Sequence, residues 1–157
     1  GPSRKPSRKS RRKSMNILIV NGPNLNLLGL REPEIYGKGT YAELCARIRG
    51  HAESVGISVD VRQTNHEGTI IDWLQEEWPK LDGIILNPGA LTHYSYALRD
   101  TVAAIPVPVV EVHLSDIASR EPFRRVSVIR DVCAAQIAGK GFEGYVEALD
   151  WLRNRKG

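Results

Sequence analysis

Cysteine, methionine and aromatic residues are scarce in this 157-residue chain, and no long apolar run interrupts it. Its two cysteines, Cys45 and Cys133, form no CxxC pair, which argues against a disulfide framework or a zinc ribbon. We expect both to be reduced thiols of a cytoplasmic protein. The apolar runs are far shorter than the ~18 residues of a membrane-spanning helix, and no apolar signal-peptide segment follows the basic start, so we expect no membrane association.

Basic charge is concentrated in residues 1–14, which hold seven of the 22 Lys and Arg residues and no acid. The whole chain has a net charge of +4, but residues 15–157 carry 15 basic and 18 acidic side chains, which gives −3. Such a mildly acidic domain is not typical of a nucleic-acid-binding protein. We expect residues 1–14 to be a disordered tail left by cloning, with Met15 as the native start. The alternative is a native arm that binds RNA or a membrane surface.

Short apolar segments alternate with amphipathic ones from Met15 onward. Strands are predicted over 16–21, 57–62, 82–87, 108–113 and, more weakly, 135–138. Helices are predicted over 41–55, 67–78, 92–104 and 142–155, with Thr40 as the N-cap of the first and Gly56 at its end. Five β–α units in this order predict one domain, residues 15–157, of the α/β class, with a five-stranded parallel sheet and helices on both faces.

Polar and turn-forming side chains follow three of the predicted strands. Ligands of parallel sheets bind beyond the carboxyl ends of the strands, so these residues are candidates for a site. The first strand leads into NGPNLN at 21–26, the third into NPGA at 87–90, and the fourth ends at His113. Glu111 lies two positions before His113 on the same face of its strand, and its carboxylate could orient the imidazole and raise its basicity.

Residues 28–37 form a long loop that we interpret as a lid, although a mobile surface loop with a charged patch is the alternative. Arg31 and Tyr36 lie five residues apart in it. A nearby guanidinium favours the phenolate, and a shift of two to three units from ~10 would make Tyr36 a general base near neutral pH. Arg120, Arg124 and Arg125 are either a solvated face or an anion clamp.

The remaining motifs say less about function. GKGFEG at 139–144 matches GxGxxG, but no further strand follows it, so we interpret it as a tight strand-to-helix turn rather than a dinucleotide site. No Walker A pattern is present. None of the four histidines has metal-ligand spacing; we expect His51 to be solvated and His66 to cap a helix.

Together these residues resemble type II 3-dehydroquinate dehydratase. Four blocks within residues 15–152 carry the resemblance: NGPNLNLLGLREPEIYG (21–37), LNPGALTHYSYALRD (86–100), EVHLSDIASREPFRR (111–125) and GKGFEGYVEALDWL (139–152). The resemblance implies a flavodoxin-like three-layer sandwich and trimers assembled into a homododecamer. It also implies the interconversion of 3-dehydroquinate with 3-dehydroshikimate and water, with no metal, Schiff base or other cofactor. The reaction would serve the shikimate pathway or, alternatively, quinate catabolism.

The resemblance also implies roles for individual residues. Tyr36 would remove the C2 proton, and Arg31 would lower the pKa of that tyrosine. Asn24 would position a water against the enolate. His113, oriented by Glu111, would protonate the departing hydroxyl.

Six further residues are implied to bind the substrate: Asn87, His93, Asp100, Leu114, Ser115 and Arg124. Asn87 and the Leu114–Ser115 segment would hold the carboxylate, His93 and Arg124 would bind ring hydroxyls, and Asp100 would come from a neighbouring subunit. The rival readings are a flavodoxin-like domain that binds FMN or a nucleotide at the same edge, and a regulatory or RNA-associated module that works through residues 1–14.

Overall fold

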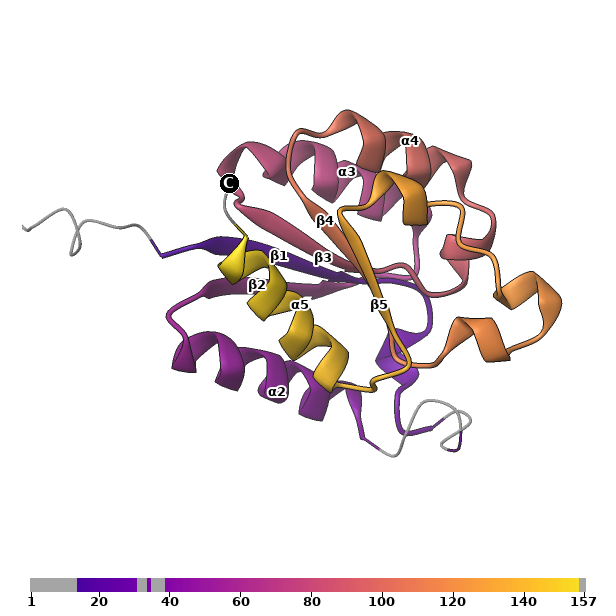
Figure 1. The fold of residues 1–157 in the computed structure, drawn as a ribbon, viewed down its shortest axis with the longest axis horizontal. Helices are drawn as coiled ribbons and strands as arrows, with labels where there is room; N and C mark the ends of the chain where they lie inside the picture. Colours follow the sequence, from indigo (N-terminus) through magenta and orange to yellow (C-terminus); the bar gives the residue numbers. More distant parts are fainter. Residues whose placement is uncertain (1–13, 31–33, 35–38, 156–157) are drawn as a thin grey trace, which may run out of the picture.

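Five parallel strands form the central sheet of the computed structural model, which describes residues 14–30, 34 and 39–155 (Figure 1). The strands are β1 (Asn16–Asn21), β2 (Ser58–Gln63), β3 (Gly83–Asn87), β4 (Val109–His113) and β5 (Ala135–Ala138). Their order is β2-β1-β3-β4-β5, which is the order of flavodoxin-like folds. The predicted fold class is confirmed. The predicted tail lies outside the described residues except for Ser14.

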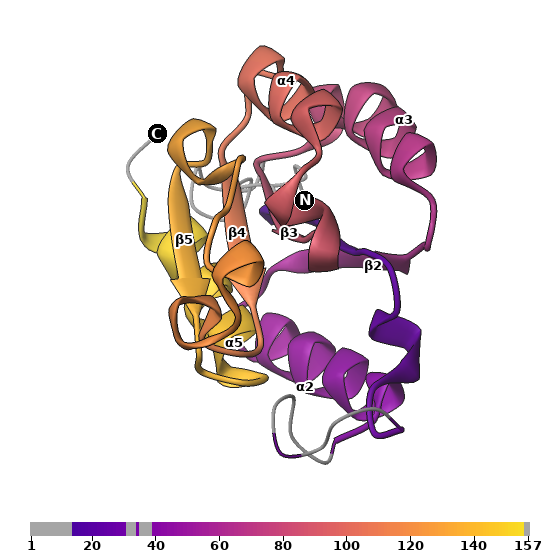
Figure 2. The ribbon, with the colours of Figure 1, turned by 90° about the vertical axis from the view of Figure 1, so that its right-hand side faces the viewer.

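Helices cover both faces of this sheet, as Figure 2 shows. The helices are α2 (Tyr41–Ser54) and α5 (Glu143–Asn154) on one face, and α3 (Glu67–Glu77) and α4 (Tyr96–Ala104) on the other. Alternation along β1 supplies both cores, because successive side chains of a strand point to opposite faces. Ile17 and Ile19 pack beneath α2 and α5, whereas Leu18 and Val20 pack beneath α3 and α4.

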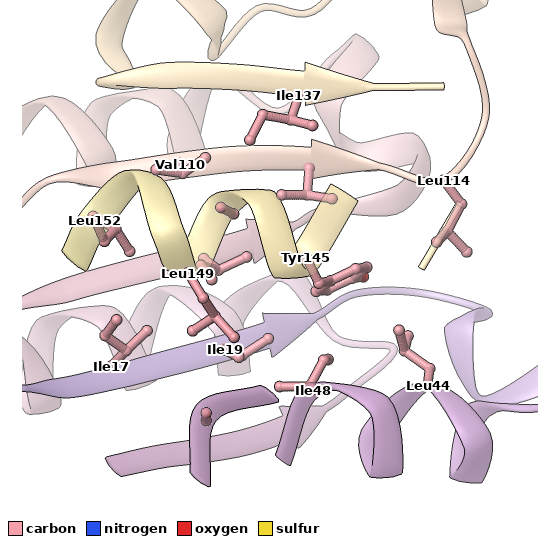
Figure 3. Close-up of a cluster of buried hydrophobic side chains, with 14 of the residues drawn as sticks. Ile17, Ile19, Leu44, Ile48, Val110, Leu114, Ile137, Tyr145, Leu149 and Leu152 are labelled. Atoms are coloured by element: carbon pink, nitrogen blue, oxygen red, sulfur yellow. The ribbon is translucent and has the colours of Figure 1, made fainter. Parts of the chain in front are cut away.

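The core under α2 and α5 fixes these helices against the sheet (Figure 3). Ile19 of β1, Ile48 of α2 and Leu149 of α5 are completely buried there. Burying one such side chain contributes about 1.5–3 kcal/mol relative to leaving it in water. Tyr145 of α5 is also completely buried, and its ring extends this core toward the carboxyl ends of the strands.

Capping determines where two of the helices begin. The Thr40 hydroxyl accepts a hydrogen bond from the Glu43 backbone N–H at 3.1 Å, which confirms the predicted N-cap of α2. The predicted helix over 92–104 is wrong at its start, because Ser95 is the N-cap of α4 and accepts from the Leu98 N–H at 3.1 Å. Thr92 belongs instead to a short 3-10 turn, Gly89–His93.

Glycines let the loops after β1 and β3 approach each other closely. The Gly22 N–H donates to the Asn87 carbonyl at 2.8 Å, and a Cβ at Gly22 would lie 2.8 Å from the Pro88 carbonyl oxygen. Gly89 has a φ of +58°, in the left-handed region that favours glycine. The chain reverses its strand order between β1 and β3, and flavodoxin-like folds bind ligands at this switch point.

Both cysteines are free thiols, as predicted. Burial raises the pKa of Cys133 to about 12, so this thiol is protonated at neutral pH. Within residues 14–30, 34 and 39–155, no helix has the length and apolar character needed to cross a membrane.

Candidate active site

A pocket opens where the carboxyl ends of β1, β3 and β4 meet. It is lined by residues at the ends of these strands and in the segments that follow them: Pro23, Asn24, Leu25, Asn87, Gly89, Ala90, His93, His113, Leu114, Ser115, Ile117, Arg120 and Arg124. Seven of the predicted site residues are among them. Of the others, Glu111 is hydrogen-bonded to His113, Asp100 is exposed on α4 and does not line the pocket, and Arg31 and Tyr36 lie outside the described residues.

His113 and Glu111 form a buried pair in the wall of the pocket. His113 Nε2 lies 2.5 Å from Glu111 Oε2, and the glutamate has no exposed surface. The predicted sharing of one strand face is therefore confirmed. A carboxylate can only accept, so Nε2 donates the hydrogen bond and Nδ1 is the ring nitrogen left to exchange a proton with a ligand.

Glu111 is held by more donors than His113 alone. Its carboxylate accepts from the Thr92 hydroxyl at 2.5 Å, the Ser127 hydroxyl at 2.8 Å and the Gln136 amide at 3.0 Å. Burial alone would raise the pKa of Glu111, but the hydrogen bond and charge of His113 and the two hydroxyls outweigh it. The net effect lowers the pKa of Glu111, so the buried carboxylate stays ionised.

His93 differs from His113 in the ring nitrogen that carries its proton. Its Nδ1 lies 2.7 Å from the Val126 carbonyl oxygen, which can only accept, so Nδ1 carries the proton. Burial, together with the nearby charges of His113 and Arg124, lowers the pKa of His93 against the opposing effect of the Val126 bond. A neutral His93 therefore keeps an Nε2 lone pair that can accept from a hydroxyl group.

Arg124 brings a guanidinium to the pocket with unused hydrogen-bonding capacity. Its buried Nε has no hydrogen-bond partner among the described residues; Glu121 Oε2 lies 3.3 Å away, but without hydrogen-bond alignment. The guanidinium also stacks 4.8 Å from the centroid of the Phe123 ring. A buried donor without a partner is costly, which favours a ligand acceptor at this position.

Arg120, one of the three arginines that the sequence marks as either a solvated face or an anion clamp, brings a second guanidinium to the pocket. Its Nη1 donates to the Ser115 hydroxyl at 3.3 Å, beside the predicted carboxylate-binding segment. Arg125 does not line the pocket, and its Nε donates to the Arg120 carbonyl at 2.7 Å. The predicted arginine cluster therefore splits, with two members at the pocket and one bracing the loop.

Asn24 is the one described non-glycine residue with a positive φ, at +70°. Asparagine tolerates this left-handed conformation better than most residues. The Asn24 backbone N–H donates to Asn65 Oδ1 at 3.0 Å, and Gln63 Nε2 donates to the same oxygen at 3.1 Å. These contacts fix the turn after β1 and leave Asn24 in the pocket lining.

A chain of buried polar groups lies under the pocket floor. Asn87 Nδ2 donates to the Tyr145 hydroxyl at 2.8 Å, and that hydroxyl donates to Asn21 Oδ1 at 2.6 Å. The Gly89 backbone N–H donates to Asn87 Oδ1 at 3.2 Å. Burial raises the pKa of Tyr145 far above its usual value, so the phenol is neutral. Nothing in the sequence pattern distinguished Tyr145 from an ordinary core residue.

Two histidine predictions need correction. His51 is not simply solvated, because its Nε2 lies 2.8 Å from Asp150 Oδ1 between α2 and α5. His66 occupies the N-cap position of α3, but its side chain makes no capping hydrogen bond. The GKGFEG segment does form the predicted turn between β5 and α5, with a positive φ at Gly139 and Gly141. Among residues 14–30, 34 and 39–155, no three His, Cys, Asp or Glu side chains gather as metal ligands.

Comparisons with known proteins point to one family. The family model described as dehydroquinase class II matches residues 15–153. A 3-dehydroquinate dehydratase from Roseiflexus castenholzii is 52% identical over 143 residues, which cover 91% of each chain. One from Bacillus cereus is 56% identical over 133 residues, covering 85% of this chain and 91% of the relative.

Solved structures give the same result. The crystal structure of type II dehydroquinase from Butyrivibrio crossotus superposes with a TM-score of 0.88 at 48% identity, covering 90% of this chain and 99% of that one. The corresponding structure from Propionibacterium acnes has a TM-score of 0.86 at 40% identity, covering 91% of this chain and all of that one.

Proposed function

We propose, from the membership of this chain in the class II dehydroquinase family, that it dehydrates 3-dehydroquinate to 3-dehydroshikimate through an enolate intermediate. The chain is an enzyme of the 3-dehydroquinate dehydratase type. The observation that carries the proposal is the buried Glu111–His113 pair, which faces a pocket at the switch point of the sheet. This family membership also favours a dehydratase over a flavin- or nucleotide-binding domain.

Loss of water needs an acid, because hydroxide is a poor leaving group. We assign this role to His113, whose Nδ1 would deliver the proton to the C1 hydroxyl. Glu111 keeps the imidazole oriented and stabilises its protonated form through the 2.5 Å contact.

Enolate formation needs a strong base, because the proton α to a ketone is weakly acidic. We assign this role to Tyr36 as its phenolate, with Arg31 stabilising the anion. Asn24, in the turn after β1, would hold a water against the enolate oxygen and so stabilise its developing charge.

The remaining pocket residues suit a polyhydroxylated ring with one carboxylate. Asn87 and the Leu114–Ser115 segment would bind the carboxylate, beside the Arg120 guanidinium. His93 Nε2 would accept from a ring hydroxyl, and Arg124 Nε would donate to one.

We further propose that the chain works as trimers assembled into a dodecamer. Asp100 is exposed on α4 and does not line the pocket of its own chain, so we assign its substrate-binding role to the pocket of a neighbouring subunit. Tyr94, Tyr96 and Phe123 are each at least 60% exposed, and burying such aromatic rings favours association. Light scattering should give a mass twelve times the 17.5 kDa of the chain.

A role in the shikimate pathway and a cytoplasmic location complete the proposal, with no cofactor required. The function is tested by mixing the purified protein with 3-dehydroquinate and following the absorbance of the conjugated enone. We expect the wild-type protein to form the enone and Tyr36→Phe to lose turnover while still binding a substrate analogue. Absence of enone formation by the wild-type protein would contradict the proposal.

A further inference from the structure

We propose that Tyr145 and Asn21 are positioning residues that hold the Asn87 amide with its N–H, rather than its carbonyl oxygen, available to the carboxylate of the substrate. This inference rests on the proposed function, and it concerns two completely buried residues that do not line the pocket. Figure 3 shows Tyr145 on α5 with its hydroxyl directed toward the carboxyl ends of the strands.

The orientation of the Asn87 amide follows from one fixed donor. The Gly89 backbone N–H lies 3.2 Å from one end of the amide, and a backbone N–H can only donate. That end must therefore be the oxygen, Oδ1. The other end, 2.8 Å from the Tyr145 hydroxyl, must then be the nitrogen, Nδ2.

The same reasoning fixes the direction of the whole chain. Asn87 Nδ2 donates to Tyr145, so the single phenolic hydrogen is free to be donated elsewhere. It goes to Asn21 Oδ1 at 2.6 Å. The reverse direction would place Asn87 Nδ2 against the Gly89 N–H, so that one donor would face another. Asn87 is only 2% exposed, so water could not take the place of the missing acceptor. Only one orientation satisfies every group.

The consequence for the pocket is electrostatic. Nδ2 carries two hydrogens, and Tyr145 accepts only one, so the second is left as a donor on a residue that lines the pocket. An amide turned the other way would present its oxygen to a carboxylate, with which it cannot form a hydrogen bond. Acting together with the Gly89 N–H, the buried phenol thus favours an anionic substituent through Asn87.

Removal of the phenolic hydroxyl should weaken this selection. In Tyr145→Phe, Asn87 Nδ2 loses its acceptor and Asn21 Oδ1 loses its donor, so only the 3.2 Å bond from the Gly89 N–H still restrains the amide, and Nδ2 can turn toward Asn21 Oδ1. The pocket donor is then withdrawn. Hydrogen bonds to charged groups contribute enough that losing one weakens binding about tenfold or more.

The test compares two non-reacting ring analogues, one with the carboxylate and one with a primary carboxamide in its place. Isothermal calorimetry gives the ratio of their dissociation constants in each protein. We expect Tyr145→Phe to lower the preference for the carboxylate about tenfold. Tyr41→Phe is the matched control, because it removes a hydroxyl at the far end of the same chain, 3.4 Å from Asn21 Nδ2. It should keep the wild-type preference.

Three outcomes would overturn the inference. The first is an unchanged carboxylate preference in Tyr145→Phe. The second is an equal loss of affinity for both analogues in Tyr145→Phe, which indicates a merely structural role. The third is an equally large loss of preference in Tyr41→Phe. If Tyr145→Phe does not fold, side-chain NMR of wild-type protein with labelled asparagine replaces it. One Asn87 amide proton should be protected from exchange, and the other should shift only with the carboxylate analogue; two equally exchanging protons would refute the inference. Failure of the wild-type protein to form the enone would instead refute the proposed function.

Discussion

Glu111→Gln tests the division of labour between the two chemical steps. The change removes the negative charge beside His113 but keeps the length of the side chain. Thr92 and Ser127 can accept as well as donate, so their hydroxyls can still pair with a glutamine amide. We therefore expect the variant to fold and the protonated form of His113 to lose its anionic partner.

The expected magnitude follows from the 2.5 Å contact between His113 Nε2 and Glu111 Oε2. A hydrogen bond to a charged group contributes about 1.5–3 kcal/mol, and each 1.4 kcal/mol is a factor of ten. Dehydration should therefore slow roughly 10- to 100-fold. Removal of the C2 proton is assigned to Tyr36 rather than to His113, so its rate should change little.

Two assays separate the steps. Enone absorbance reports dehydration, and loss of the C2 proton signal in deuterated water reports enolate formation. Glu143→Gln is the matched control, since it makes the same change in an exposed ion pair with Arg47 at 2.9 Å, and both rates should stay at wild-type values. If Glu111→Gln slows both steps equally, the assignment of the pair to the departing hydroxyl is wrong.

Three further predictions concern stability and binding. The pKa of Glu111 in the folded protein is lowered from 4.5, so the ionised carboxylate stabilises the fold above pH 4.5, and this contribution is lost as the pH falls through the folded-state pKa. In urea unfolding between pH 7 and 3, the free energy of unfolding should fall more steeply for the wild-type protein than for Glu111→Gln. Arg124→Ala should raise KM at least tenfold in steady-state kinetics, and an unchanged KM would exclude the guanidinium from binding. Gly22→Ala should lower the free energy of unfolding by about 1–3 kcal/mol, because its Cβ would meet the Pro88 carbonyl oxygen at 2.8 Å; equal denaturation midpoints would contradict this close approach.

The sheet could be predicted from the sequence because buried parallel strands are short continuous apolar runs, and each of the five was located within a residue or two. The start of α4 could not. Thr92 has the side-chain character and spacing of a helix residue, but its hydroxyl is bonded to Glu111 and its carbonyl accepts from Val128. These tertiary contacts hold Thr92 in the 3-10 turn, and the helix begins only after Ser95.

The site was predictable where position in the strand decides it. His113 and Glu111 could be paired because their spacing of two residues places both on one face. Thr92, Ser127 and Gln136 were missed because they reach Glu111 from three different segments, and only the folded arrangement brings them together. Tyr145 was missed because a tyrosine on the apolar face of a helix looks like core until its hydroxyl partners are known.

The central claim is that one pocket holds an acid and a base on opposite sides of the same ring. A crystal structure with a carboxylate-bearing analogue of 3-dehydroquinate tests it most directly. We expect the ring to lie between His113 and Tyr36, with Arg31 beside the phenol and the carboxylate at Asn87 and Ser115. A complex in which Tyr36 and Arg31 stay far from the ring, with no neighbouring subunit supplying them, would contradict the account.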